Sequence, residues 1–478
     1  MYSSASREQI NVFHFIKKYS LLFLCFIAFM ATGNAQQVPS FKQVVTEFYT
    51  RYSFEDYEKY LRFQKRKDGW FVAQDYYNDP GKYFNERLFW SAKDASYLDI
   101  NYHSSTDDTS SVASRVASYL KTIDWAFEEY QFERNKYYGY PGWDWDMIND
   151  PRKQNEITDT LWESMARAYS NYASGFIVEQ YGDLFQNNDA DRMPLKPTDS
   201  ISLSRRDKFI FYETKAIEAY KNILNQNPFY QTRVGSIQIK LANEYMFVYS
   251  DLVMAADSIR AKEFAMQAVY PDSLLTRSRA YLDSLPLHSL LVTGGDNDTY
   301  PIWYLQETKK FRKDVLVLNY SLLGLRKYLY IHDKITKGTL FKTKDSIYLK
   351  NNFEYFLYSN GSKNFQAIDA TEFITNLNKN KNPFDSAKTY YKEEILKKYY
   401  SKKLYFSPKL PVNIPGKKRV HSGIIALNDY LLINDFIMLD IINTNMNKRS
   451  VYSTFDIQLL SPILVFNGVT YKVKLVNN

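Results

Sequence analysis

The stretch from residue 289 to residue 320 constrains the fold of this chain more than any other. An apolar run at residues 290–293 is followed by two glycines and a polar cluster, and a second apolar run occupies residues 315–320. The first run has the length of a buried strand, the glycines turn the chain, and Pro301 suits the first turn of a following helix. The pattern predicts a βαβ unit, whose loops hold ligands at the carboxyl ends of parallel strands.

The first 35 residues have the pattern of a secretory signal peptide. Arg7, Lys17 and Lys18 form a basic lead, residues 21–31 are an apolar core, and small residues occupy positions 33–35. The core is shorter than the roughly 20 residues needed to span a bilayer, so we expect cleavage before Gln36 and no integral membrane span in the mature chain. The expected location is periplasmic or outer-membrane associated, in a Gram-negative bacterium.

Cysteine content and charge exclude several functional classes. The single cysteine, Cys25, lies between large apolar residues inside the signal core, which is not the pattern of a lipid acceptor site. The mature chain would then have no disulfide, thiolate nucleophile or cysteine-ligated metal.

Without residues 1–35 the chain keeps 58 of its 61 basic and 52 of its 53 acidic side chains, a net charge of +6. This modest, dispersed charge does not indicate a nucleic-acid partner.

Periodicity predicts an α+β multidomain chain. The expected parts are the signal peptide (1–35), a small antiparallel β module (36–110), a helical-hairpin block (111–285) and an α/β domain (286–478). In the β module a helix at 41–49 precedes two strand pairs, 60–65 with 70–76 and 87–90 with 97–102. The helical block begins with an amphipathic helix over 111–135.

The helical block loosely resembles tetratricopeptide repeats. Its helices carry small and aromatic residues on their inner faces and end at Pro228 and Pro271. These prolines are 43 positions apart, not the about 34 of a true tetratricopeptide repeat. The block is either a scaffold or a concave surface for a peptide or glycan. The aromatic loop at residues 137–146, with its two carboxylates, is likewise either a glycan platform or a buried corner.

In the α/β domain, helices are expected at 321–334 and 427–443, and a strand at 450–455. Between them, residues 334–403 look like an irregular insertion with helices at 369–377 and 387–400. Asn467 and Gly468 separate two apolar segments, 463–466 and 469–476, which predicts a terminal β-hairpin.

Several blocks of the α/β domain resemble a known family. They are Gly-Asp-Asn-Asp-Thr-Tyr-Pro-Ile-Trp-Tyr-Leu-Gln-Glu at 295–307, residues 314–323, residues 435–442 with Asn445, Lys448, Arg449 and Tyr452, and residues 468–473. This region resembles the soluble carboxyl-terminal part of a bacterial membrane family similar to protein O-mannosyltransferases, itself largely of unknown function. The membrane-spanning half that holds the sugar donor in such enzymes has no counterpart here, so transferase activity is not carried over. Asn447 and Ser450 also replace the aromatic residue and proline usual in that family.

The polar loop at 296–299 is the first candidate site. Asp296 and Asp298 would repel a phosphate, and no lysine follows the glycines, so a phosphate-binding loop is excluded. The two carboxylates either cap the helix, coordinate a divalent cation, or accept protons from a polar ligand. If the second resemblance block meets this loop, Arg449 pairs with one of them. The candidate binding residues are Asp296, Asn297, Asp298, Thr299, Trp303, Asn319, Ser321, Asp440, Asn445 and Arg449.

Two functions remain open at this point. The first is an exported, non-enzymatic binding or scaffold protein of the cell envelope that recognises a glycan or a peptide and needs no cofactor. The alternative is a hydrolase or transferase acting on envelope glycans with Asp296 or Asp298 as acid or base. Histidines at 103, 288, 332 and 421 stand in no catalytic or metal-ligand spacing.

Overall fold

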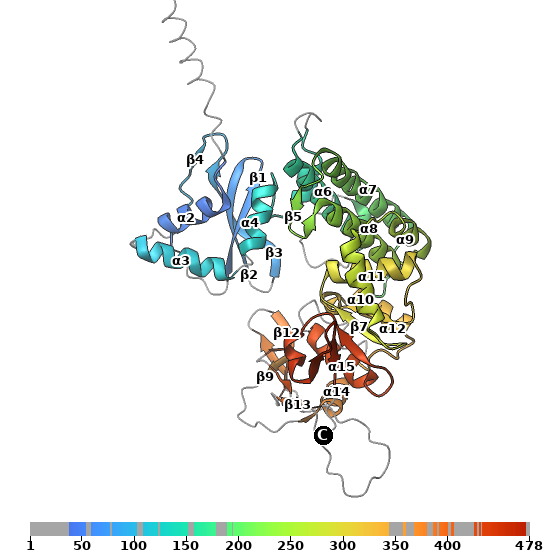
Figure 1. Cartoon of the computed structure of the whole chain (residues 1–478). Coiled ribbons are helices and arrows are strands. Elements are labelled where there is room, and N and C mark those ends of the chain that lie inside the picture. Colours follow the sequence, from blue (N-terminus) through green and yellow to red (C-terminus); the bar gives the residue numbers. More distant parts are fainter. Residues whose placement is uncertain are drawn as a thin grey trace, which may run out of the picture. The chain divides into compact units, whose positions relative to one another are not determined.

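The computed structural model describes residues 38–53, 59–76, 79–102, 109–122, 125–151, 157–177, 189–193, 195–343, 357–359, 368–379, 386–389, 392–399, 403–405, 425–427, 430–431 and 433–474. They form two compact units (Figure 1). The first ends at Tyr140, the second begins at Pro141, and residues 79–81 group with the second. The mixed α+β class expected from the sequence is confirmed.

A four-stranded sheet organises the described part of the first unit. Its strands, in spatial order, are β1 (Lys59–Arg66), β2 (Gly69–Tyr76), β3 (Asp79–Ser91) and β4 (Ser96–Tyr97), and β1–β2 and β3–β4 pair antiparallel. Helix α2 (Phe41–Arg51) starts with a capping box made by Ser40 and Gln43, and it packs Phe41 and Phe48 into the aromatic core beneath the sheet. The expected pair of 60–65 with 70–76 is confirmed. Of the expected pair of 87–90 with 97–102, only the start is confirmed, because β4 ends at Tyr97 and residues 98–102 form no strand. The expected helix over 111–135 is divided into α3 (Thr109–Thr122) and α4 (Trp125–Arg134).

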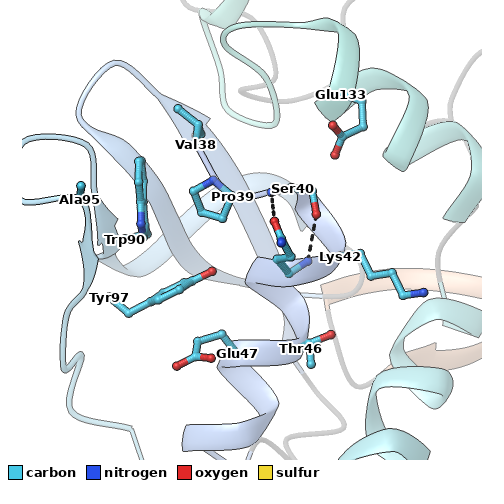
Figure 2. A pocket seen from close by; sticks show the side chains of 11 residues that line it. Val38, Pro39, Ser40, Lys42, Thr46, Glu47, Trp90, Ala95, Tyr97 and Glu133 are labelled. Carbon is cyan, nitrogen blue, oxygen red and sulfur yellow. Dashed lines mark hydrogen bonds between the residues drawn. The ribbon is translucent and has the colours of Figure 1, made fainter. Parts of the chain in front are cut away.

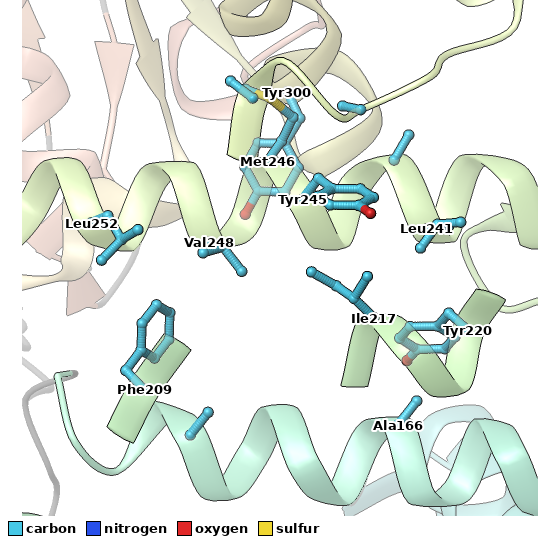
Figure 3. Close-up of a cluster of buried hydrophobic side chains, with 14 of the residues drawn as sticks. Ala166, Phe209, Ile217, Tyr220, Leu241, Tyr245, Met246, Val248, Leu252 and Tyr300 are labelled. Atoms are coloured by element: carbon cyan, nitrogen blue, oxygen red, sulfur yellow. The ribbon is translucent and has the colours of Figure 1, made fainter. Parts of the chain in front are cut away.

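Helices make up the first part of the second unit: α5 (Trp143–Ile148), α6 (Asp159–Ser174), α7 (Leu203–Gln226), α8 (Ile237–Met254), α9 (Ser258–Ala265) and α10 (Asp272–Asp283). A short hairpin, β5 (Gln231–Thr232) and β6 (Gly235–Ser236), joins α7 to α8. Figure 3 shows Phe209, Ile217 and Tyr220 of α7 between α6 and α8. Small residues such as Ala166 let the helices approach closely, as their sequence pattern predicts.

A five-stranded mixed sheet organises the second half of this unit, in the order β17-β18-β16-β7-β8. Strand β7 (Leu290–Thr293) lies between β8 (Leu316–Asn319) and β16 (Val451–Ser453) and is parallel to both. Helix α11 (Asp296–Thr308) connects β7 to β8, which confirms the βαβ unit. The hairpin β17 (Leu464–Phe466) and β18 (Tyr471–Val473) is also confirmed. Leu290 and Leu291 enter different apolar clusters, so both faces of β7 are covered.

Several boundaries differ from expectation. The helix expected over 321–334 is a 3-10 turn, η3 (Ser321–Gly324), followed by α12 (Arg326–Ile335), and α15 (Ile433–Asn445) starts later than expected. Helix α14 (Ala370–Lys379) is confirmed, but the helix expected over 387–400 is wrong. That segment forms β11 (Ser386–Thr389) and β12 (Lys392–Tyr399), because β12 also pairs with β9 (Leu357–Ser359) and this pairing overrides its Glu- and Lys-rich composition.

The remaining described elements are β10 (Ile368–Asp369), β13 (Lys403–Tyr405), β14 (Ile425–Ala426), β15 (Tyr430–Leu431), the 3-10 helix η2 (Ala190–Arg192) and the 3-10 helix η4 (Gln458–Ile463). None of the helices in the described ranges combines the length and the apolar character needed to cross a membrane. The expected signal segment, residues 1–35, lies outside the described residues.

Candidate functional site

The segments that follow β7, β8 and β16 meet at one edge of the sheet, here called the carboxyl edge (residues 293–299, 319–321 and 454–455). The Tyr320 N–H donates to the Thr293 carbonyl at 3.0 Å, and the Thr454 N–H donates to the Val292 carbonyl at 2.9 Å. Helix α11 leads from β7 to β8, whereas β16 arrives on the other side of β7. The edge is therefore a topological switch point, where open α/β sheets leave a crevice for ligands.

Two glycines form the centre of the carboxyl edge. A Cβ on Gly294 would lie 3.2 Å from the ring of Phe455, so glycine lets that ring pack against the backbone. A Cβ on Gly295 would meet no atom within 4 Å. Its φ of −177° is ordinary extended backbone. Gly295 therefore opens onto free space that a ligand can occupy.

Asn297 and Asp298 are held by the helical part of the unit. The Asn297 side-chain amide donates to the Val234 carbonyl at 2.8 Å, and its oxygen accepts from the Asn243 amide at 2.8 Å. Asp298 accepts from Arg277 at 3.2 Å and from the Thr454 hydroxyl at 3.2 Å. These contacts fix the loop between α8, α10 and β16. Both residues therefore have structural roles.

Thr299 and Asn319 support the edge from inside. The Thr293 hydroxyl donates to the Leu318 carbonyl at 3.1 Å, so the buried Thr299 hydroxyl, 2.6 Å away, donates to Thr293. The Asn319 side chain accepts from the Ser321 N–H at 2.9 Å and shapes the turn after β8. The Ser321 hydroxyl donates to the Gly294 carbonyl at 3.3 Å and is exposed, so it is within reach of a ligand.

Asp296 differs from its neighbours. Among the described residues, its carboxylate has neither a hydrogen bond nor an ion pair. Crowding by protein atoms raises the pKa of this carboxyl group. The positive charge of Lys240 opposes that change, and the negative charge of Glu244 adds to it. The residue is nevertheless exposed, so solvent screening opposes this effect. It can accept hydrogen bonds from a ligand.

Aromatic rings flank the glycines. Phe455 and Tyr320 are half-buried and meet edge to face, with ring centroids 5.7 Å apart. The Tyr320 hydroxyl donates to Asp435 in the first turn of α15, which fixes its ring. Trp303, expected at the site, instead packs partly buried among three apolar clusters under α11.

Asp440, Asn445 and Arg449 lie elsewhere. The buried Asp440 carboxylate accepts from the Lys342 and Thr343 amides at 2.8 and 2.6 Å, and the Asn445 amide donates to the Leu340 carbonyl at 2.6 Å. Both side chains bind the segment after α12 and do not approach the 296–299 loop. Arg449 was expected to pair with Asp296 or Asp298, but the arginine that pairs with Asp298 is Arg277.

Arg277 was missed by sequence reasoning, although one signal pointed to it. Pro301 is the sixth residue of α11 and not in its first turn, so the Asn297 carbonyl has no helical N–H to accept. Arg277 donates to that carbonyl at 3.1 Å. A proline at this depth in a helix implies an outside donor, but its identity leaves no trace in the local sequence.

A metal site finds no support in the described ranges, where no three His, Cys, Asp or Glu side chains converge in a suitable arrangement. In the aromatic loop at 137–146, Asp144 is buried and pairs with the buried Arg192 at 3.4 Å, and Arg192 lies over the ring of Tyr172, whereas Asp146 is exposed. A glycan platform at Asp144 is therefore ruled out by burial.

The first unit contains a hollow of 880 Å³ between the start of α2, the β3–β4 hairpin and the end of α4 (Figure 2). Its two carboxylates and Ser40 are already engaged. Glu47 pairs with Arg51 at 2.7 Å, Glu133 accepts from the Phe41 N–H at 3.2 Å, and Ser40 is part of the capping box. The carboxyl edge is the stronger candidate because it lies at the carboxyl ends of three neighbouring strands and combines the exposed Asp296 with the open Gly295.

Comparison with known protein families gives a match to the C-terminal part of the chain. Residues 275–477 match the family described as TMEM260-associated domain 2. The match begins in α10 and includes the whole carboxyl edge. No curated protein matches the chain, and no solved structure matches it.

Proposed function

We propose that the second unit is a binding module that recognises a glycan at the carboxyl edge. One observation carries the proposal: the loop holding Asp296 is fixed through Asn297 and Asp298, while Asp296 itself is left exposed beside the open Gly295. A fixed loop loses little entropy when a ligand binds. Recognition of a polar ligand therefore needs no rearrangement here.

The chemistry of the edge favours sugar hydroxyls. A carboxylate at Asp296 and a hydroxyl at Ser321 match the donors and acceptors of a sugar, and half-buried rings at Phe455 and Tyr320 suit its apolar face. The resemblance of this region to a membrane family similar to protein O-mannosyltransferases supports the same ligand class. A peptide is the competing ligand, since its backbone also offers donors and acceptors.

Binding of purified protein to an array of bacterial envelope oligosaccharides tests the proposal. We expect Asp296→Asn to weaken binding roughly tenfold or more, as for loss of a hydrogen bond to a charged group. Asp272→Asn is the matched control, because Asp272 is also an exposed acid in the first turn of a helix. Binding to unstructured peptides in place of glycans, or equal binding by both variants, would contradict the proposal.

A second function is favoured by the pKa of Asp296. Crowding raises that pKa, which is the direction that general acid catalysis requires. Asp298, the other carboxylate of the loop, is paired with Arg277. Incubation of envelope glycans with the wild type and Asp296→Asn, followed by mass spectrometry of the products, separates binding from catalysis. Products formed by the wild type alone would establish the enzyme.

Export to the periplasm or outer membrane is part of the proposal. The basic lead, the apolar core and the small residues at 33–35 support it. Intact-mass measurement of protein from envelope fractions should give a chain beginning at Gln36. A mass that includes residues 1–35, or a lipid adduct, contradicts this localisation mechanism.

A further inference from the structure

Three of the buried acidic side chains in the helical part of the second unit lie on α7 and α8. Glu213 of α7 and Glu244 and Asp251 of α8 are exposed by 0%, 2% and 3%. Within the described residues, both carboxylate oxygens of Glu213, Oε1 of Glu244 and Oδ2 of Asp251 have no hydrogen-bond partner. Buried charges need a counter-ion or a proton, so the ionisation state of this cluster has to be accounted for.

The cations near the cluster are too few to balance it. Lys240 binds Glu244 at 2.5 Å, and Arg167 of α6 binds Glu163 at 3.0 Å. These two bridges neutralise Glu244 and Glu163. No described cation forms an ion pair with Glu213 or Asp251. Burial and Glu244 raise the pKa of Glu213, and the Ser170 hydroxyl of α6 and the Lys240 ammonium oppose this with smaller effects. The buried hydroxyl of Tyr220 on α7 lies near Lys240 and Glu244.

Helix α11 packs against the same region. Its buried Tyr300 lies close enough to Asp251, Glu244, Asp296 and Tyr270 for each of them to raise the Tyr300 pKa. Figure 3 shows Tyr300 beside Met246 of α8. Asn243, one residue before Glu244, is the residue that bonds Asn297 in the loop. Helix α8 thus carries both the acid cluster and the contact that fixes the carboxyl edge.

We propose that Glu213 and Asp251 form a buried proton-binding centre whose deprotonation loosens α8 from α11 and frees the 296–299 loop. An ionised carboxylate without a cation needs water, and water reaches these positions only if α7, α8 and α11 separate. Separation weakens the Asn243–Asn297 hydrogen bond, since that bond spans α8 and α11. The proposal concerns loop mobility and holds whatever ligand the edge binds.

Burial sets the pH range. It raises the pKa of Asp251 to about 8, and it raises the pKa of Glu213 well above its usual value, with Glu244 raising it further. Because both pKa values lie above those of the unfolded chain, the protonated groups stabilise the fold at low pH. That stabilisation is lost as the pH rises through about 8 for Asp251.

Hydrogen exchange of the full chain, read on the peptide covering residues 294–308 at pH 6 and pH 9 and corrected for intrinsic rates, tests the proposal. We expect wild-type protection to fall about tenfold, and melting temperature by about 5 °C, between these values. Asp251→Asn and Glu213→Gln, which keep shape without charge, should each reduce the fall. Glu218→Gln, an exposed acid on α7, should behave as the wild type.

Each variant is read separately, so a folding defect in one leaves the other to decide. Constant wild-type protection from pH 6 to pH 9 would overturn the proposal. An equal loss in wild type, Asp251→Asn and Glu213→Gln would also overturn it, because the loosening would then come from another group.

Discussion

Arg277 donates a hydrogen bond, at 3.1 Å, to the carbonyl of Asn297. That carbonyl is the one which Pro301 leaves without a partner inside α11, since proline has no N–H. The same guanidinium also bonds Asp298. One exposed arginine from α10 therefore completes the first turn of α11 and fixes the candidate loop.

A double-mutant cycle measures this relationship. We expect Arg277→Ala to cost about 1 kcal/mol in the wild type, and less in a Pro301→Ala background, where the introduced alanine restores a helical N–H to Asn297. Chemical denaturation of the four proteins gives the coupling energy, expected at about 0.5–1 kcal/mol. Strict additivity would show that the two residues act independently.

Asp440 should affect stability and not ligand binding. Its Oδ2 accepts from two backbone amides and the Thr343 hydroxyl, and its Oδ1 accepts from Thr444 at 3.0 Å. Asp440→Ala leaves these buried donors unpaired, and we expect a loss of about 2–4 kcal/mol. Asp440→Asn keeps one acceptor oxygen and should lose less. Chemical denaturation measures both losses. Reduced glycan affinity in a folded Asp440→Asn protein would contradict the prediction, because it would show that Asp440 takes part in binding.

Gly175 is required by the buried pair of Asp144 and Arg192. A Cβ on Gly175 would lie 2.5 Å from the Arg192 Nε. Gly175→Ala should displace the guanidinium and leave Asp144 poorly paired. Arg192→Met removes the cation altogether, and we expect a cost of about 3–5 kcal/mol for the unpaired buried charge. Thermal unfolding at pH 7 checks both, and a neutral Gly175→Ala would show that the corner can rearrange.

Protonation of His332 should lower the free energy of unfolding in acid. Burial lowers its pKa to about 4, whereas an unfolded histidine titrates near 6.5. The unfolded state therefore binds the proton first, and stability falls as the pH drops from about 6.5 to about 4, by at most about 3 kcal/mol. His332→Gln should remove this component. Denaturation at pH 7 and pH 4.5 measures the difference between the two proteins, and an equal acid loss in both would contradict the assignment.

Local sequence patterns were sufficient to predict those elements whose strand or turn signal lies within the element itself. The apolar runs at 290–293 and 315–320 predicted β7 and β8, and Asn467 with Gly468 predicted the closing hairpin. Each of these signals is a short-range property: strand length, β-branched content or turn chemistry. The segment over 387–400 failed because its structure depends on pairing with β9, which is distant in sequence.

Only the local part of the candidate site was predicted from the sequence, because its distant contacts leave no short-range signal. The loop at 296–299 follows directly from β7, so sequence located it. Asn243 and Arg277, which fix it, lie on α8 and α10, and no spacing or composition rule connects them to the loop. For Asp440, reasoning that a buried polar residue needs partners was right, but it could not choose between two distant segments.

Strand β7 acquires its two neighbours at very different times during synthesis. Leu290 pairs with Leu316 in β8, but its partner in β16 is Val451, 161 positions away. Until that residue has been made, one side of β7 is an unpaired strand edge with apolar side chains on both faces, which can pair with other chains. Ribosomes that stall before residue 451 would therefore release an aggregation-prone open sheet, and the second unit has to complete its folding after almost all of its chain has emerged.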